Sequence, residues 1–132
     1  MSGPEVGRTK AAGFQAGARA TLNVPARRLW EFIVSAEGQY ALGSASSELT
    51  KDSEGVTAFI DGSHFRRRIS ADDGRGWLLQ VRVLEAPVGR SRIALHGERL
   101  ADAGDREETL KRFHEILRRI GLAVSAAASA PT

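Results

Sequence analysis

The sequence contains no cysteine, and this absence excludes several kinds of chemistry at once. Disulfide bonds, thiolate nucleophiles and cysteine-based metal sites all need that residue. Apolar runs are also short: none approaches the ~20 residues of a membrane-spanning helix, and the first residues carry no apolar segment typical of a secretory signal. We therefore expect a cytoplasmic protein that does not insert into a membrane.

Sequence motifs for common catalytic sites are missing as well. The chain has no glycine-rich phosphate loop followed by Lys-Ser or Lys-Thr, no His-Glu-x-x-His pair and no nucleophile elbow. The sequence therefore predicts no catalytic residue, no metal ion and no cofactor, and it carries no signature of an enzyme.

Size and charge are those of an ordinary globular domain. The 132 residues suffice for one hydrophobic core, and a content of 42% hydrophobic and 27% charged residues is typical of folded proteins. The net charge of +3 comes from 19 basic and 16 acidic residues. Because the arginines are spread along the chain, we expect no binding of nucleic acid. One domain is predicted over residues 18–123, between flexible tails at residues 1–17 and 124–132.

Alternation of apolar and polar residues predicts a series of short strands. The expected strands cover residues 18–24, 48–50, 56–60, 64–70, 77–84 and 91–96. Gly55, Asp61-Gly62 and residues 86–89 supply the turns between the later strands. Connections of this hairpin length join antiparallel strands, so the sheet is expected to be antiparallel.

Two regions have the apolar spacing of amphipathic helices. A short helix is expected after Pro25, because proline suits the first helical turn. A stronger apolar stripe runs through residues 110–120, with Asp102 or Asp105 placed to cap its start and Gly121 placed to end it. These patterns predict an α+β fold, in which a curved antiparallel sheet of about six strands wraps around a long C-terminal helix.

The order of these elements and two segments resemble the SRPBCC or START-like superfamily. The segments are Val24-Pro-Ala-Arg-Arg-Leu-Trp-Glu-Phe and His96-Gly-Glu-Arg-Leu-Ala-Asp-Ala-Gly-Asp-Arg-Glu. The nearest branch is that of the homologues of the activator of heat-shock-protein ATPase, found in many small bacterial proteins. The resemblance covers residues 18–123 and implies a helix-grip fold, with an apolar cavity between the sheet and the C-terminal helix. Two departures bear on the size of that cavity: Ala41 precedes Leu42-Gly43 where relatives commonly have tryptophan, and six strands are expected where seven are usual.

The resemblance implies binding of a small hydrophobic or amphipathic molecule, similar to a lipid or a polyketide, by a monomer or a homodimer. Eleven side chains are expected to line the cavity: Phe32, Tyr40, Phe59, Phe65, Arg67, Leu79, Val81, Ile93, Leu95, Phe113 and Leu117. Two alternatives stay open. One is a cyclase-like or hydratase-like enzyme in which Arg67, Tyr40 or Glu98 polarises a carbonyl. The other is a co-chaperone-like module that binds a protein through the outer face of the sheet.

Arg67 is the one charged residue expected inside the cavity. It is the middle of three consecutive arginines, so strand alternation places it on the face of Phe65. A buried guanidinium needs a partner, which we expect to be Glu98, an aspartate or a ligand carboxylate.

The remaining polar candidates are expected outside the cavity. Alternation places His64 and His96 on the outer face of the sheet, where a surface role is favoured over acid-base catalysis, and His114 lies beside the helical stripe. Glu98 and Arg99 are expected in the turn before the last helix, as an ion pair or a cap.

Overall fold

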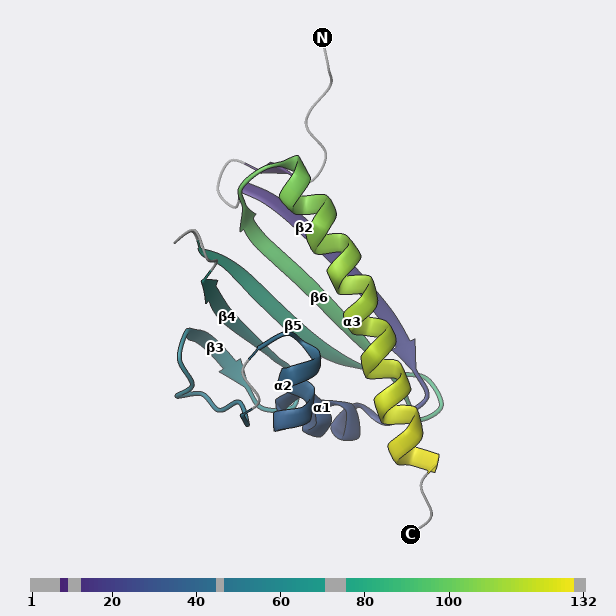
Figure 1. The fold of residues 1–132 in the computed structure, drawn as a ribbon. Helices are drawn as coiled ribbons and strands as arrows, with labels where there is room; N and C mark the ends of the chain where they lie inside the picture. The colour runs from purple at the N-terminus through teal and green to yellow at the C-terminus, as the bar shows by residue number, and fades with distance from the viewer. Residues whose placement is uncertain (1–7, 10–12, 45–46, 71–75, 130–132) are drawn as a thin grey trace.

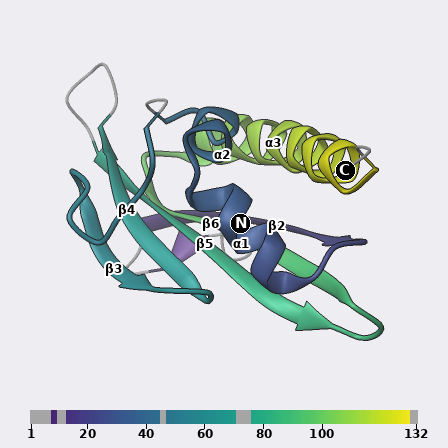
Figure 2. The ribbon, with the colours of Figure 1, turned by 90° about the horizontal axis from the view of Figure 1, so that it is seen from below.

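The three helices of the described residues lie on one face of a curved antiparallel sheet (Figures 1 and 2). The architecture comes from a computed structural model that describes residues 8–9, 13–44, 47–70 and 76–129. The six strands lie in the order β1-β2-β6-β5-β4-β3, and every neighbouring pair is antiparallel. The predicted α+β fold, with a sheet of about six strands and a long C-terminal helix, is confirmed.

The helices and strands follow one another largely in the predicted order. The strands are β1 (Arg8–Thr9), β2 (Gly13–Leu22), β3 (Val56–Ile60), β4 (His64–Ser70), β5 (Gly76–Ala86) and β6 (Arg90–Leu100). The helices are α1 (Ala26–Val34), α2 (Ala36–Ala41) and α3 (Ala103–Ser129). No helix in these described segments is long and apolar enough to cross a membrane.

The first half of the chain departs from the expected strands at three places. Arg8–Thr9, expected in a flexible tail, form β1 and pair with β2. β2 begins at Gly13, so residues 13–17 belong to the sheet and not to a tail, because Ala16 is buried in the core and pairs with β6. Residues 1–7 and 10–12 of the expected tail lie outside the described part of the chain. Residues 48–50 do not form a strand. Instead, Leu49 is buried and its N–H donates to the Val34 carbonyl at 2.8 Å, which fastens this segment to α1.

β6 and α3 are both longer than expected. Glu98 and Arg99 lie within β6, not in a turn: Glu98 pairs with Leu78, and Arg99 has a positive φ of 63° beside an irregularity in the pairing with β2. α3 begins after Asp102, whose Oδ1 accepts a hydrogen bond from the Asp105 N–H at 2.8 Å.

The helix then continues past Gly121 to Ser129, because the apolar stripe continues beyond the glycine. Gly121 lies against Leu22, and Val124 is 3% exposed, so the helix keeps a buried face here. The alanine-rich sequence that follows is also favourable for helix. Residues 124–129 are therefore helical and not a tail, and residues 130–132 lie outside the described part.

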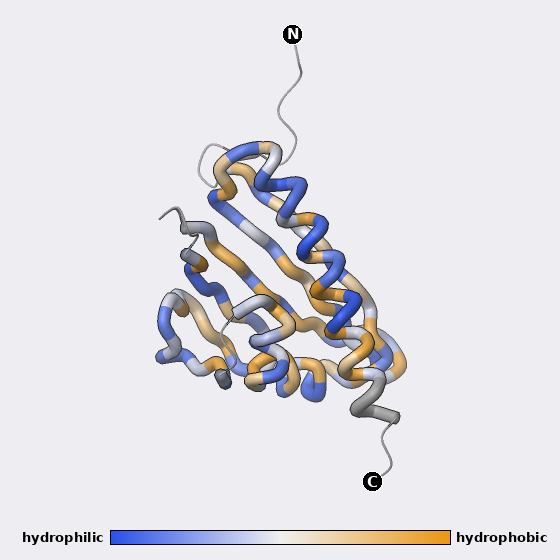
Figure 3. The backbone as a smooth tube through the Cα atoms, in the orientation of Figure 1, coloured by the Kyte–Doolittle hydropathy of each residue, from blue (hydrophilic) through white to orange (hydrophobic). Residues whose placement is uncertain are grey.

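The core fills the space between α3 and the inner face of the sheet. Hydrophobic and hydrophilic residues alternate along α3, as an amphipathic helix requires (Figure 3). Its buried side chains are Leu117, Ile120 and their neighbours on the same stripe, and the helix packs mainly on β2 and also on β6. Fully burying one such side chain contributes about 1.5–3 kcal/mol, so this stripe holds α3 firmly on the sheet.

Candidate functional site

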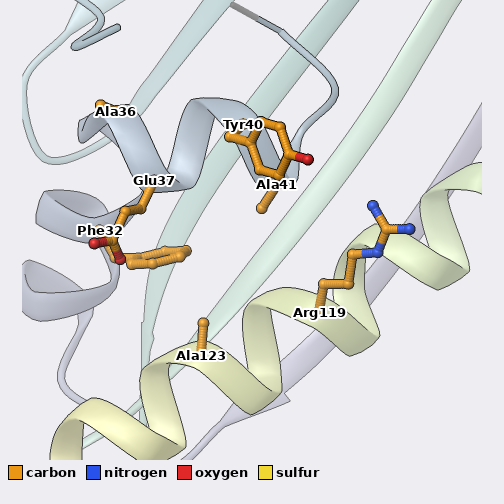
Figure 4. A pocket seen from close by; sticks show the side chains of 7 residues that line it. All are labelled: Phe32, Ala36, Glu37, Tyr40, Ala41, Arg119 and Ala123. Atoms are coloured by element: carbon orange, nitrogen blue, oxygen red, sulfur yellow. The ribbon is translucent and has the colours of Figure 1, made fainter. Parts of the chain in front are cut away.

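A pocket of about 600 Å³ opens between α2 and the second half of α3, beside the end of α1 (Figure 4). Its walls come from all three helices: Phe32, Ala36, Glu37, Tyr40, Ala41, Arg119 and Ala123. Three of these are alanines, whose short side chains leave the space free. A hollow of this size, lined mainly by apolar groups with a few polar ones, is typical of sites for small organic molecules.

The pocket combines an apolar wall with charged groups at its rim. Phe32 is half-buried and packs against the core, whereas Tyr40 is 68% exposed and offers its ring and hydroxyl. Glu37 and Arg119 supply one charge of each sign. The Arg119 Nε donates to Glu115 at 3.3 Å, and the side chain is 57% exposed, so its guanidinium stays accessible to a ligand. This arrangement suits a molecule with an apolar body and a polar end.

The tight junction between α1 and α2 sets the position of the pocket wall. Ser35 separates the helices, and its hydroxyl donates to the Phe32 carbonyl at 2.6 Å while accepting from the Gly38 N–H at 3.1 Å. A side chain on residue 38 would overlap the backbone carbonyls of Phe32 and Ile33. Glycine at this position therefore lets α2 fold back against the end of α1.

A buried amide fixes α2 to the sheet. The Gln39 side chain is completely buried; its Nε2 donates to the Ile33 carbonyl at 2.9 Å and its Oε1 accepts from Arg67 Nη1 at 3.2 Å. Arg67 also donates from Nε to the Glu54 carbonyl at 3.0 Å. The expected anionic partner of Arg67 is thus replaced here by a neutral amide and a backbone carbonyl. Sequence reasoning missed Gln39, although a glutamine next to a tight glycine junction was available as a signal.

A second polar contact anchors α1 to the turn between β3 and β4. The buried Trp30 donates from its indole Nε1 to Asp61 at 2.9 Å, and Arg27 donates to the other carboxylate oxygen at 3.1 Å. These hydrogen bonds, first that from Arg27 and then that from Trp30, hold the pKa of Asp61 below its usual value. The Trp30 ring also packs edge-on against Phe59 and Phe65, with centroid separations of 5.7 and 6.4 Å.

The structure separates the eleven predicted ligand-binding residues into three groups. Phe32 and Tyr40 line the pocket. Seven are buried in the core: Phe65, Leu79, Val81, Ile93, Leu95, Phe113 and Leu117. Phe59 is partly buried against that core, and Arg67 is half-buried beside Gln39. At the seven core positions, the space between sheet and helix is occupied by packed side chains, and the pocket between α2 and α3 lies beside this core.

The residues expected to polarise a carbonyl do not meet. Tyr40 is in the pocket and Arg67 is bonded to Gln39, whereas Glu98 lies on the outer face of the sheet. There, its carboxylate accepts from Arg66 at 3.1 Å and lies 3.4 Å from His96 Nε2. His96 is on that outer face, as predicted. Among the described residues, no group of three or more His, Asp and Glu side chains is placed to hold a metal ion.

Comparison with solved structures identifies the fold. No family model and no curated protein matches the sequence. DynU16, from the dynemicin biosynthetic locus, matches 86% of this chain with a TM-score of 0.71 and 8% identity. CalU16 from Micromonospora echinospora matches 89% of the chain and 79% of its own length with a TM-score of 0.70 and 13% identity. The chain has the helix-grip fold. The Aha1 dimer from Colwellia psychrerythraea shares it, with a TM-score of 0.62, 8% identity and coverage of 81% of this chain and 92% of that one.

The helix-grip fold, which the resemblance to the SRPBCC or START-like superfamily implied, is thereby confirmed. The chain spans 48% of the length of DynU16. At identities of 8 to 13%, TM-scores of 0.71 and 0.70 show a shared architecture alone.

Proposed function

We propose that this helix-grip protein binds a small apolar or amphipathic molecule in the pocket between α2 and α3. The observation that supports this most directly is the hollow of about 600 Å³ with an aromatic and alanine wall, because exposing such a wall to water is unfavourable unless a ligand covers it. All seven lining residues come from one chain, so the proposal requires only a monomer. A cytoplasmic location is part of the proposal.

The ligand contacts Phe32 and the Tyr40 ring through its apolar body, which is lipid-like or polyketide-like. Its polar end lies at the rim, where Arg119 pairs with an anionic group or the Tyr40 hydroxyl forms a hydrogen bond. In this proposal, the other nine residues expected to bind ligand support the pocket without lining it. The apolar ones pack in the core under α3, and Arg67 donates a hydrogen bond to Gln39.

Native mass spectrometry of the protein purified from its expression host tests the proposal. A bound small molecule should be retained by the wild-type protein and lost from Ala123→Trp, because the indole fills the pocket. Leu122→Trp is the matched control, since Leu122 is the neighbouring residue on the same helix and is 61% exposed. If both variants retain the molecule equally, it binds elsewhere and the proposal is wrong.

A further inference from the structure

Within the described part of the chain, no helix covers the outer face of the sheet, because α1, α2 and α3 all lie on the opposite side (Figure 2). Residues that pair directly in an antiparallel sheet project their side chains from the same face. His64 pairs with Arg82, Arg82 with Ala94, and Ala94 with Arg19. These side chains form one row across four strands. They project from the face opposite to that of Val81 and Val83, the buried neighbours of Arg82.

Parallel rows on the same face carry further basic residues. Arg66 pairs with Gln80, which pairs with His96. Rows on either side contain Arg68, which pairs with Leu78, and Arg92, which pairs with Thr21. The outer face of the four central strands therefore gathers six arginines. Five of them form what we call the arginine face: Arg19, Arg66, Arg68, Arg82 and Arg92. The sixth, Arg90, lies at the turn between β5 and β6, where its Nε donates to the Pro87 carbonyl.

Only part of this charge is neutralised within the described residues. Glu98 is the acidic residue of these rows, and it pairs with Arg66 at 3.1 Å and lies 3.4 Å from His96. The other four arginines have no acidic partner in the described part of the chain. With His neutral, five arginines and one glutamate give the face a charge of +4, which exceeds the +3 of the whole chain. The remainder of the protein is thus slightly acidic.

Such a concentration of like charge opposes folding, because neighbouring cations on one sheet face repel each other. We propose that the arginine face binds an acidic segment of a partner protein, whose Asp and Glu carboxylates pair with the guanidinium groups. Arginine suits this role because its planar fork donates two parallel hydrogen bonds to one carboxylate.

The composition of the face favours a protein partner over a nucleic acid. Sheets that bind single-stranded RNA or DNA stack bases on aromatic side chains. None of the described aromatic residues lies in the rows of the arginine face: Phe65 and Trp77 face the core, and Tyr40 is on α2. Ile60, which pairs with His64 at the end of one row, is 56% exposed and provides an apolar contact beside the cations.

Fluorescence anisotropy with a labelled peptide of alternating Glu and Ala residues tests this inference on the full chain. The double variant Arg19→Gln/Arg92→Gln removes two exposed charges from the face. Arg28→Gln/Arg112→Gln is the control, since it removes two exposed charges from α1 and α3. We expect the face variant to bind the peptide about tenfold more weakly and the control to bind within about twofold of wild type. Affinity should also fall as salt rises.

Two results would overturn the inference. One is an equal loss of affinity in both double variants, which would show attraction to net charge without a site. The other is tighter binding of a single-stranded oligouridylate of the same charge, lost in the face variant, which would assign the face to nucleic acid. Circular dichroism of each variant checks that the fold is retained, and the retained ligand of the pocket should be unaffected in both.

Discussion

Replacing Gln39 with leucine should destabilise the protein more than the sizes of the two side chains suggest. Leucine has nearly the volume of glutamine, so the substitution creates little empty space in the core. It removes both hydrogen bonds of the buried amide, to the Ile33 carbonyl and from Arg67. The hydrogen bond that connects α2 to β4 is then lost.

The expected loss follows from these two bonds. A buried carbonyl that loses its donor costs about 1–3 kcal/mol, and a hydrogen bond from a charged group contributes about 1.5–3 kcal/mol when it is fully buried. Because Arg67 is only half-buried and keeps its bond to the Glu54 carbonyl, its contribution lies at the low end. We expect Gln39→Leu to lower the free energy of unfolding by about 2–4 kcal/mol, a large part of the 5–15 kcal/mol typical of a domain.

Urea unfolding followed by circular dichroism measures this change. Gln80→Leu is the control, because Gln80 is half-buried on the sheet and forms no side-chain hydrogen bond within the described residues; it should change stability by less than about 0.5 kcal/mol. A double-mutant cycle with Arg67→Met should give a coupling of about 1 kcal/mol. If Gln39→Leu is as stable as wild type, the amide does not hold α2 and this account of the pocket wall is refuted.

Three further predictions concern backbone geometry and pH. Val88→Asn should raise the free energy of unfolding by about 1 kcal/mol in urea, because Val88 has a positive φ of 61° that asparagine tolerates better, and its side chain is 95% exposed; no gain would contradict this. Gly38→Ala should lower the melting temperature, because the methyl group would overlap backbone carbonyls of α1. An unchanged melting temperature would show that the backbone between α1 and α2 can shift to accommodate the methyl group. The pKa of Asp61 is lowered from 3.8 by Arg27 and Trp30, so their bonds stabilise the fold above about pH 4 and are lost below it. In pH-dependent urea unfolding, wild type should therefore lose its advantage over Asp61→Asn as the pH falls below about 4, and a constant difference would refute this.

Much of the fold could be predicted because alternation and helical spacing are local properties of the sequence. The strands at 56–60 and 64–70 were predicted with their observed bounds, and α3 was recognised from one stripe of apolar residues. The errors arose where tertiary contacts override local signals. Residues 13–17 contain two glycines and only one large apolar residue, Phe14, yet they pair with β6. Gly121 should end a helix in isolation, but packing against Leu22 and the buried Val124 carry the helix onward.

The site was harder to predict because it depends on how three helices meet. Inward alternation correctly selected core residues such as Phe65 and Leu95, but being inward does not distinguish a packed core from a cavity wall. The pocket exists because alanines on α2 and α3 face each other. The periodicity within one helix does not predict which residues of another helix lie opposite to it.

The arginine face was similarly hidden. Its residues are far apart in the sequence, which led us to expect a weak and dispersed charge. The strand register brings them together on one surface.

The single tyrosine of the chain allows the central claim to be tested directly. Tyr40 lines the pocket, so its ring resonances report on the site in a nuclear magnetic resonance titration with myristate or 8-anilinonaphthalene-1-sulfonate. We predict that these signals shift and saturate in wild type and in Leu122→Trp, and stay unchanged in Ala123→Trp. Tyrosine signals that do not move in wild type at saturating concentrations of either molecule would contradict a ligand site between α2 and α3.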